Sequence, residues 1–226
     1  DDTLKFNDDA VLTGSFDGQS DHDTIDMSAY SVARQAQLNG LGSTDGFVGT
    51  INGVTAGFNN LDAIIASAAA TDDRITGRQA DAFWNIDSLA GNQYTAIQDL
   101  TLTGNETDYD AKKAVVQGRT ALVTNGSPVV LDFSGFEILQ GGNQNDLFEF
   151  TGSPTHSVLG GDNEDYFAFN DGATFTGTID GQAGRDTLDY NAGSVATYAT
   201  GVDFVLGSLG SANGFAGTVS NFTGTF

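Results

Sequence analysis

Internal repetition constrains the fold of this chain more than any other feature of its sequence. Residues 2–31 match residues 165–194 without a gap at 15 of 30 positions, and residues 38–54 match residues 206–222 at 8 of 17. These matches give duplicated units, 2–54 and 165–222, inside a repeat of about 165 residues. The sequence starts within one copy and stops within the next. It therefore predicts one segment, 1–226, of a longer repetitive protein.

A shorter unit recurs inside the long one: a glycine turn, an aspartate and a strand. Its turns read GQSDHD, GGNQND, GGDNED and GQAGRD and begin at Gly18, Gly141, Gly160 and Gly181. Each closing aspartate precedes alternating apolar residues, in TIDM, LFEF, YFAF and TLDY, and Asp2-TLKF is a fifth copy. This period of two predicts a β-strand. Successive units of about 20 residues predict stacked rungs of an all-β solenoid.

The alternation also predicts which side chains point into the solenoid. Leu4 and Phe6 begin the inward set, which continues with Ile25, Met27, Phe148, Phe150, Phe167, Phe169, Leu188 and Tyr190. The residues between them, Lys5, Asp26, Glu149, Ala168 and Asp189, are expected to point outward. In DAFWNID, an inward Phe83 would leave Trp84 outward, as a contact for a sugar or a neighbouring subunit.

The middle of the chain is less regular. Ile75–Asp87 is predicted to form a turn and then a strand, and Val129–Leu139 to resume the strand pattern. Residues 107–127 are predicted to be an insertion that bulges from the solenoid. Tyr109–Leu122, with acidic residues early and basic residues late, is the best helix candidate.

Charge limits the partners. The net charge is -22, and 26 of the 30 acidic residues are aspartate. Such a surface excludes nucleic acid and anionic membranes as partners and favours cations. The chain has no cysteine, and no apolar run approaches the ~20 residues of a membrane-spanning helix.

The glycine turns resemble the calcium-binding nonapeptide of RTX proteins, G-G-x-G-x-D-x-Φ-x, where Φ is apolar. The resemblance implies Ca²⁺ ligands at Asp23, Asp146, Asp165 and Asp186. Asp162, beside Asn163 and Glu164, would add oxygens to the six to eight that calcium prefers. An aspartate before a strand also caps backbone groups without a metal, so both interpretations stay open.

Longer stretches around these turns resemble repeats of very large bacterial exoproteins of the filamentous-haemagglutinin or adhesin type. The stretches that carry the resemblance are GFEILQGGNQNDLFEF and GTIDGQAGRDTLDYNA. The resemblance covers Asp2–Val54 and Gly135–Phe222. It implies a right-handed parallel β-helix, secretion, and a role as a surface fibre or adhesin at the cell surface.

The expected function is therefore structural or adhesive. Expected partners are copies of the chain or flanking repeats, joined end to end, and a surface glycan or protein receptor. We expect no enzyme, because the two histidines, His22 and His156, belong to no Ser/His/Asp set or metal-binding pair visible in the sequence. The alternative is a calcium-dependent RTX-like module of a secreted carbohydrate-active enzyme.

Overall fold

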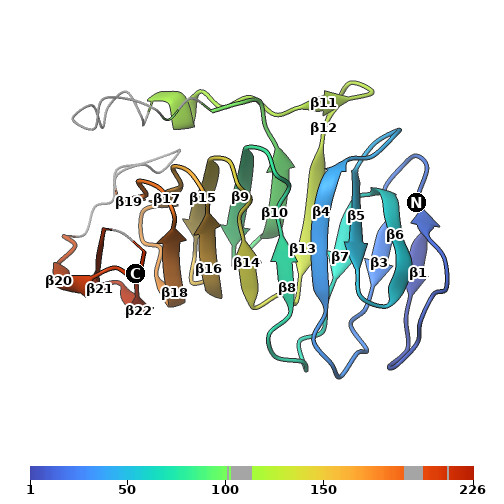
Figure 1. Cartoon of the computed structure of the whole chain (residues 1–226), viewed down its shortest axis with the longest axis horizontal. Helices are drawn as coiled ribbons and strands as arrows, with labels where there is room; N and C mark the ends of the chain where they lie inside the picture. Colours follow the sequence, from blue (N-terminus) through green and yellow to red (C-terminus); the bar gives the residue numbers. More distant parts are fainter. Residues whose placement is uncertain (101, 103–113, 191–200, 213) are drawn as a thin grey trace.

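The computed structural model describes residues 1–100, 102, 114–190, 201–212 and 214–226 (Figure 1). Within these ranges the protein is almost entirely β-structure, as the sequence predicts. No helix in the described ranges has the length and apolar character needed to cross a membrane.

Two nine-stranded sheets form the body of the molecule. The first sheet contains, in spatial order, β1 (Thr3–Lys5), β3 (Thr24–Asp26), β7 (Ala63–Ile65), β13 (Val130–Ser134), β10 (Gly91–Ala96), β9 (Ala82–Asp87), β15 (Asp146–Thr151), β17 (Tyr166–Phe169) and β19 (Thr187–Asp189). The second contains β2 (Phe16–Asp17), β6 (Val54–Leu61), β5 (Phe47–Ile51), β4 (Gln35–Leu41), β8 (Arg74–Thr76), β14 (Ile138–Gln140), β16 (Thr155–Gly161), β18 (Phe175–Gln182) and β22 (Phe222–Thr225). Two separate hairpins pair β11 (Val123–Thr124) with β12 (Ser127–Pro128), and β20 (Phe204–Leu209) with β21 (Phe215–Val219).

The chain alternates between the two sheets from β13 to β19, so that strands of successive units become parallel neighbours. Leu147 of β15 is opposite Tyr166 of β17, which is opposite Thr187 of β19. In the second sheet, Thr155 of β16 is opposite Thr176 of β18. Equivalent residues of neighbouring units therefore lie side by side.

The sheets are mixed, which corrects the expectation of a wholly parallel arrangement. β9, β10 and β13 are antiparallel neighbours, and so are β4, β5 and β6. The β5–β6 turn is Asn52-Gly53, with a Gly53 φ of 109°. Asn-Gly between two apolar runs favours a two-residue hairpin turn, which breaks the alternation between sheets.

The core lies between the two sheets, and the predicted inward set is confirmed. Each of its members is buried in the main hydrophobic cluster or packs against it. Aromatic rings from neighbouring units stack: the centroids of Phe148 and Phe167 lie 5.2 Å apart, and those of Phe169 and Tyr190 lie 4.3 Å apart. These spacings approach the ~4.8 Å between adjacent strands, so the aromatic columns follow from strand register.

The predicted orientation of Trp84 is wrong. Its side chain is fully buried in the main cluster, T-shaped against Tyr94 and stacked on Phe148. Phe83 instead lies on the outer face, where Arg119 covers its ring at 3.7 Å from the centroid. Trp84 is therefore a core residue and not a surface contact for a sugar or subunit.

The outer face of the first sheet is also partly covered, against expectation. Asp26, Glu149, Ala168 and Asp189 are all buried, whereas Lys5 is exposed. A second hydrophobic cluster lies on this side and comprises Ile97, Leu100, Leu102, Val116, Leu147, Tyr166 and Ala168. Ile97, Leu100, Leu102 and Val116 thus help to cover the outer face of β15 and β17, where Leu147, Tyr166 and Ala168 contact them.

Much of the predicted insertion, 107–127, lies outside the described residues, which resume at 114. Residues 114–117 are helical, and β11 and β12 follow. The predicted helix, Tyr109–Leu122, is too long at its C-terminal end: Gly118 is a turn, and Ala121 forms a β-bridge with Ile97.

The two duplicated units share their pairing pattern. Leu12 bridges Val54 in the first unit, and the equivalent Phe175 pairs with Phe222 in the second. The β4–β5 hairpin and the β20–β21 hairpin have the same registers and the same irregularity. The sequence repeat is thus also a repeat of strand pairing.

Candidate functional site

The four glycine–aspartate turns are the site that the sequence singles out, and the structure buries most of their aspartates. Asp23 and Asp146 are 0% exposed and Asp165 is 1% exposed. Asp186 is half-buried and Asp162 is exposed. The turns ending at Asp146, Asp165 and Asp186 lie in consecutive units, whereas the turn ending at Asp23 belongs to the other duplicated unit.

The aspartate side chains join one unit to the next. The Asp146 backbone N–H donates to Asp165 Oδ1 at 2.8 Å, and the Asp165 N–H donates to Asp186 Oδ1 at 3.0 Å. The Asp2 N–H donates to Asp23 Oδ1 at 2.7 Å in the same manner. A backbone N–H at the start of a buried strand needs a partner, and a carboxylate acceptor gives a strong, charge-assisted bond.

The first glycine of each turn makes room for that carboxylate. A Cβ on Gly160 would lie 2.2 Å from Asp165 Oδ2, and one on Gly181 would lie 2.2 Å from Asp186 Oδ2. At Gly141 and Gly18 the distances to Asp146 Oδ2 and Asp23 Oδ2 are 2.6 and 2.5 Å. The spacing of five residues between glycine and aspartate is therefore a packing requirement.

Asp146 differs from Asp165 in its partners. Asp146 Oδ1 accepts from Trp84 Nε1 at 3.0 Å, and Oδ2 accepts from the Gly142 N–H at 2.7 Å. Asp165 Oδ2 is buried and has no hydrogen-bond partner within the described part of the chain, and the same holds for Asp23 Oδ2. A buried, unpaired carboxylate oxygen is costly unless it is protonated or meets a cation.

Burial dominates the electrostatics of these turns. It raises the pKa of Asp146 from 3.8 to about 8. Burial, followed by the charge of Asp146, raises the pKa of Asp165 as well. The pKa of Asp186 is also raised, mainly by burial. In each of these groups burial makes the charged form less favourable than it is in water.

The turns do not form a ready-made cluster of acidic metal ligands. Among the described residues, no three histidine, cysteine, aspartate or glutamate side chains gather closely enough to hold a metal ion. Asp162 donates its N–H to the Gly142 carbonyl, and Asn163 Nδ2 donates to the Asn143 carbonyl at 2.7 Å. A cation at Asp165 would therefore depend on one or two carboxylates together with carbonyl oxygens of the turns.

Three further acidic residues, outside the glycine–aspartate pattern of the sequence, also accept backbone N–H groups. The Asp23 N–H donates to Asp62 Oδ2 at 3.0 Å, and the Asp73 N–H donates to Glu137 Oε2 at 2.9 Å. Asp73 itself accepts from the Arg34 N–H. Each stands two residues before a buried Ile or Leu, as in Asp62-Ala-Ile and Glu137-Ile-Leu. An acid followed by x-Φ, without the glycine turn, was the signal that could have found them.

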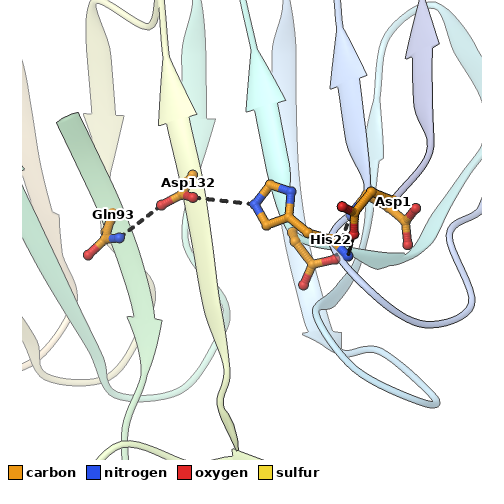
Figure 2. Close-up of polar contacts among 6 residues, drawn as sticks. Asp1, His22, Gln93 and Asp132 are labelled. Carbon is orange, nitrogen blue, oxygen red and sulfur yellow. Dashed lines mark hydrogen bonds and ion pairs between the residues drawn. The ribbon is translucent and has the colours of Figure 1, made fainter.

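The histidines do not form a catalytic set in the described residues. Figure 2 shows His22, whose Nε2 lies 3.4 Å from Asp132 Oδ2, while Gln93 Nε2 donates to Asp132 Oδ1 at 2.9 Å. Both side chains of the His22–Asp132 pair are about half exposed, so the contact is a surface ion pair when His22 is protonated. The backbone N–H of His22 also donates to Asp1 Oδ1.

The second histidine, His156, lies within a strand and is only partly exposed. It lies in β16, where Nδ1 is 3.0 Å from the Phe136 carbonyl oxygen and burial lowers its pKa. It is thus a partly buried strand residue, held by a backbone carbonyl.

Comparison with protein-family models, with curated proteins and with solved structures found no match. The similarity of the repeats to those of large exoproteins therefore stays an expectation.

Proposed function

We propose that the chain is a segment of a right-handed parallel β-helix, interrupted by antiparallel hairpins, in a secreted or cell-surface protein. Its role is to extend, assemble or adhere, and not to catalyse. The observation that carries this proposal is the pairing of equivalent residues from successive units, Leu147 with Tyr166 and Tyr166 with Thr187. The right-handed sense follows from the strong preference of parallel crossovers for that hand.

The arrangement suits a spacer because each unit contacts its neighbours in the stack. Nine strands at ~4.8 Å give each sheet a width of roughly 40 Å. The first and last strands of the first sheet, β1 and β19, lie at opposite edges. Stacked units of this kind can be added without changing the ones already present, which is the property an extended surface protein needs.

The acidic surface fits the same role. A net charge of -22 is tolerated best where salt or divalent cations screen it. Three of the eight basic residues make contacts inside the molecule. Arg34 and Arg78 are buried, and Arg119 pairs with Glu149. Their positive charge therefore offsets little of the acidic surface, which suits contact with a receptor glycan or a basic protein surface.

Location is the direct test of this proposal. Antibodies against the folded chain should label intact cells of the source organism, or the protein should be recovered from its filtered medium. An antibody against a cytosolic protein, which must stay negative on intact cells, is the control. Labelling that appears only after permeabilisation, with none in the medium, would contradict an extracellular role.

A second candidate is a calcium-dependent module of a secreted carbohydrate-active enzyme. The observation that favours it is the buried Oδ2 of Asp165 and of Asp23, which accept no hydrogen bond from any described residue. A divalent cation there would neutralise these buried carboxylates, and burial raises the pKa of Asp165 because it makes the charged form costly. Carbonyl oxygens of the neighbouring turns would supply the remaining ligands.

Thermal unfolding with Ca²⁺ and with excess chelator, at matched ionic strength, tests this candidate. Calcium at 100 times its dissociation constant should stabilise the fold by about 2.7 kcal/mol. Asp165→Asn should reduce the effect, whereas the exposed Asp72→Asn should not. Coincident curves, or a shift that NaCl reproduces, would leave these aspartates as backbone acceptors alone.

A further inference from the structure

The β20–β21 hairpin exposes an unusual amount of apolar surface. Phe204 is 47% exposed, Leu206 59%, Leu209 76% and Phe215 62%. The hairpin lies at the end of the molecule that carries β19 (Figure 1). Large exposed apolar patches of this kind usually mark a surface that contacts another molecule or segment.

The first duplicated unit shows what covers this surface. Leu38 and Phe47 of the β4–β5 hairpin are the repeat equivalents of Leu206 and Phe215, and both are 0% exposed. The hairpins are built alike: Leu38 pairs with Gly49, and Leu206 with Gly217. Identical pairing with opposite exposure means that the two hairpins differ in their neighbours and not in their own conformation.

The attachment of the hairpin to the second sheet is also repeated. β5 pairs with β6 through Gly49 and Phe58. The equivalent Gly217 and Phe226 exchange two backbone hydrogen bonds of 3.1 and 3.2 Å. β21 therefore lies beside β22 as β5 lies beside β6.

Two strands complete the first unit, and one continuous segment supplies both. β7 pairs in parallel with β3, placing Ile64 opposite Ile25, and β8 pairs in parallel with β4, placing Ile75 opposite Ala36. In the second unit, no described strand pairs with the free edge of β19, the equivalent of β3, or with that of β20, the equivalent of β4.

An open groove occupies the corresponding place. It has a volume of about 1230 Å³ and lies between β19 and the β20–β21 hairpin. Leu188, Leu206, Leu209, Phe215 and Phe226 form its apolar lining, and Asp186 lies at its polar margin. The volume exceeds that of most small-molecule pockets and suits a length of polypeptide.

We propose that this groove docks a strand of a flanking repeat whose sequence resembles Asn59–Gly77 of this chain. The strand would add in parallel to β19 and cover the hairpin, by β-augmentation. An aspartate in the position of Asp62 would accept the Asp186 N–H, as Asp62 accepts the Asp23 N–H in the first unit. This inference rests on the stacked-unit architecture proposed above and names the partner of its open end.

A second copy of the folded chain fits this end less well. Through the bonds between Gly217 and Phe226 next to β22, the hairpin places two strands beyond the level at which β19 ends the first sheet, a step of about 10 Å. β1 and β2, the opposite terminal strands, each pair with a strand of the next level, β3 and β6, so that end offers no matching step. A copy stacked by its β1–β2 end would leave the groove beneath the hairpin unfilled.

Binding of a synthetic Asn59–Gly77 peptide to the full chain tests the proposal. We expect saturable binding by calorimetry, with slower amide hydrogen exchange in β19 and β20. A control peptide with Ile64→Asn and Ile75→Asn keeps the charge and should bind at least about tenfold more weakly. Leu209→Asn in the protein should weaken binding, whereas Val11→Asn, an exposed apolar site outside the groove, should not.

Several results would overturn the proposal. These are no binding, equal binding of both peptides, or protection elsewhere than β19 and β20. Self-association of the chain that the peptide does not compete for would make a second copy the occupant instead. The peptide controls need no change in the protein, so a poorly folded Leu209→Asn leaves the test decisive. If the peptide does not bind to a chain in which Thr155 and Thr176 are shown to be opposite each other, this inference is refuted, whereas the stacked-unit architecture proposed above is not.

Discussion

Gly160 shows at the level of single residues how the repeated turn is specified. Its Cα faces the carboxylate of Asp165, and a Cβ would lie 2.2 Å from Oδ2 and 2.7 Å from the Gly181 carbonyl oxygen. Its φ is not in the left-handed region, so backbone strain is not the reason for glycine here. The sequence predicts the importance of this position from repetition, but it cannot say that the carboxylate points back at the glycine.

The first prediction follows from that contact. Gly160→Ala should destabilise the protein by about 1–3 kcal/mol, because the methyl group overlaps a buried carboxylate and a backbone oxygen. Gly201→Ala, where a Cβ would meet no atom within 4 Å, should change stability by less than about 0.5 kcal/mol. Urea unfolding measures both. Equal stability of the two variants would mean that the turn is not packed as described.

The second prediction concerns pH. Asp146 and Asp165 have folded-state pKa values above the ordinary 3.8, to about 8 for Asp146. The folded state therefore holds protons that the unfolded state has lost. The stability that these groups contribute is fully present below about pH 4 and is lost as the pH rises toward 8. His156, whose pKa is lowered, has the opposite slope near its ordinary value of 6.5.

Comparison with Asp165→Asn isolates the aspartate contribution. In chelator, the wild-type protein should lose stability between pH 5 and pH 8 relative to this variant, because the variant has no carboxyl to ionise at this position. Chemical denaturation across that range measures the difference. A difference that is constant with pH, or that grows in favour of the wild type, would contradict a raised pKa for Asp165.

At the level of elements, β9 shows where strand patterns stop being informative. Ala82, Trp84 and Ile86 face the core, whereas Phe83 contacts Arg119 on the other face. Alternation assigns a strand to one of two faces only when one face is polar. Here residues 97, 100, 102, 116 and 119 help to cover the second face, so the strand could be predicted from the sequence but its phase could not.

Other elements were predictable to different degrees. The strands after Asp23, Asp146, Asp165 and Asp186 lie where the repeats place them. The antiparallel hairpins did not follow from the repeats, because a hairpin depends on turns such as Asn52-Gly53 and not on the 20-residue spacing. In the site, the glycine–aspartate turns were found, whereas Asp62, Asp73 and Glu137 were missed because no Gly-Gly or Gly-Gln pair stands five residues before them.

The third prediction tests the phase of β9. Trp84 is the only tryptophan, so fluorescence excited at a wavelength that tyrosine does not absorb reports on it alone. Its emission should be that of an apolar environment, and iodide should quench it hardly at all until the protein unfolds. Trp84→Ala should cost about 3–5 kcal/mol in stability. Strong quenching in the folded protein would show that Trp84 is exposed and would contradict this phase.

At the scale of the whole molecule, two mixed sheets enclose one continuous core, and acidic side chains connect successive units along the edges of the strands. The core supplies most of the free energy, because burial of apolar surface is the dominant favourable contribution to folding. The aspartates accept backbone N–H groups where the strands of the neighbouring unit begin, as Asp165 accepts that of Asp146. Stacking and start positions together determine the register of parallel strands, which is the central claim about this chain.

A disulfide between two engineered cysteines tests that register most directly, because the native chain has no cysteine. Thr155 and Thr176 are directly opposite in β16 and β18, and both are exposed. Neighbouring strands lie ~4.8 Å apart, within reach of a disulfide. Thr155→Cys with Thr176→Cys should oxidise rapidly to an intramolecular disulfide in the folded protein, whereas Thr155→Cys with Thr178→Cys, displaced by two residues, should do so far more slowly. Fast oxidation of the displaced pair, or none in either, would contradict the stacked, in-register arrangement.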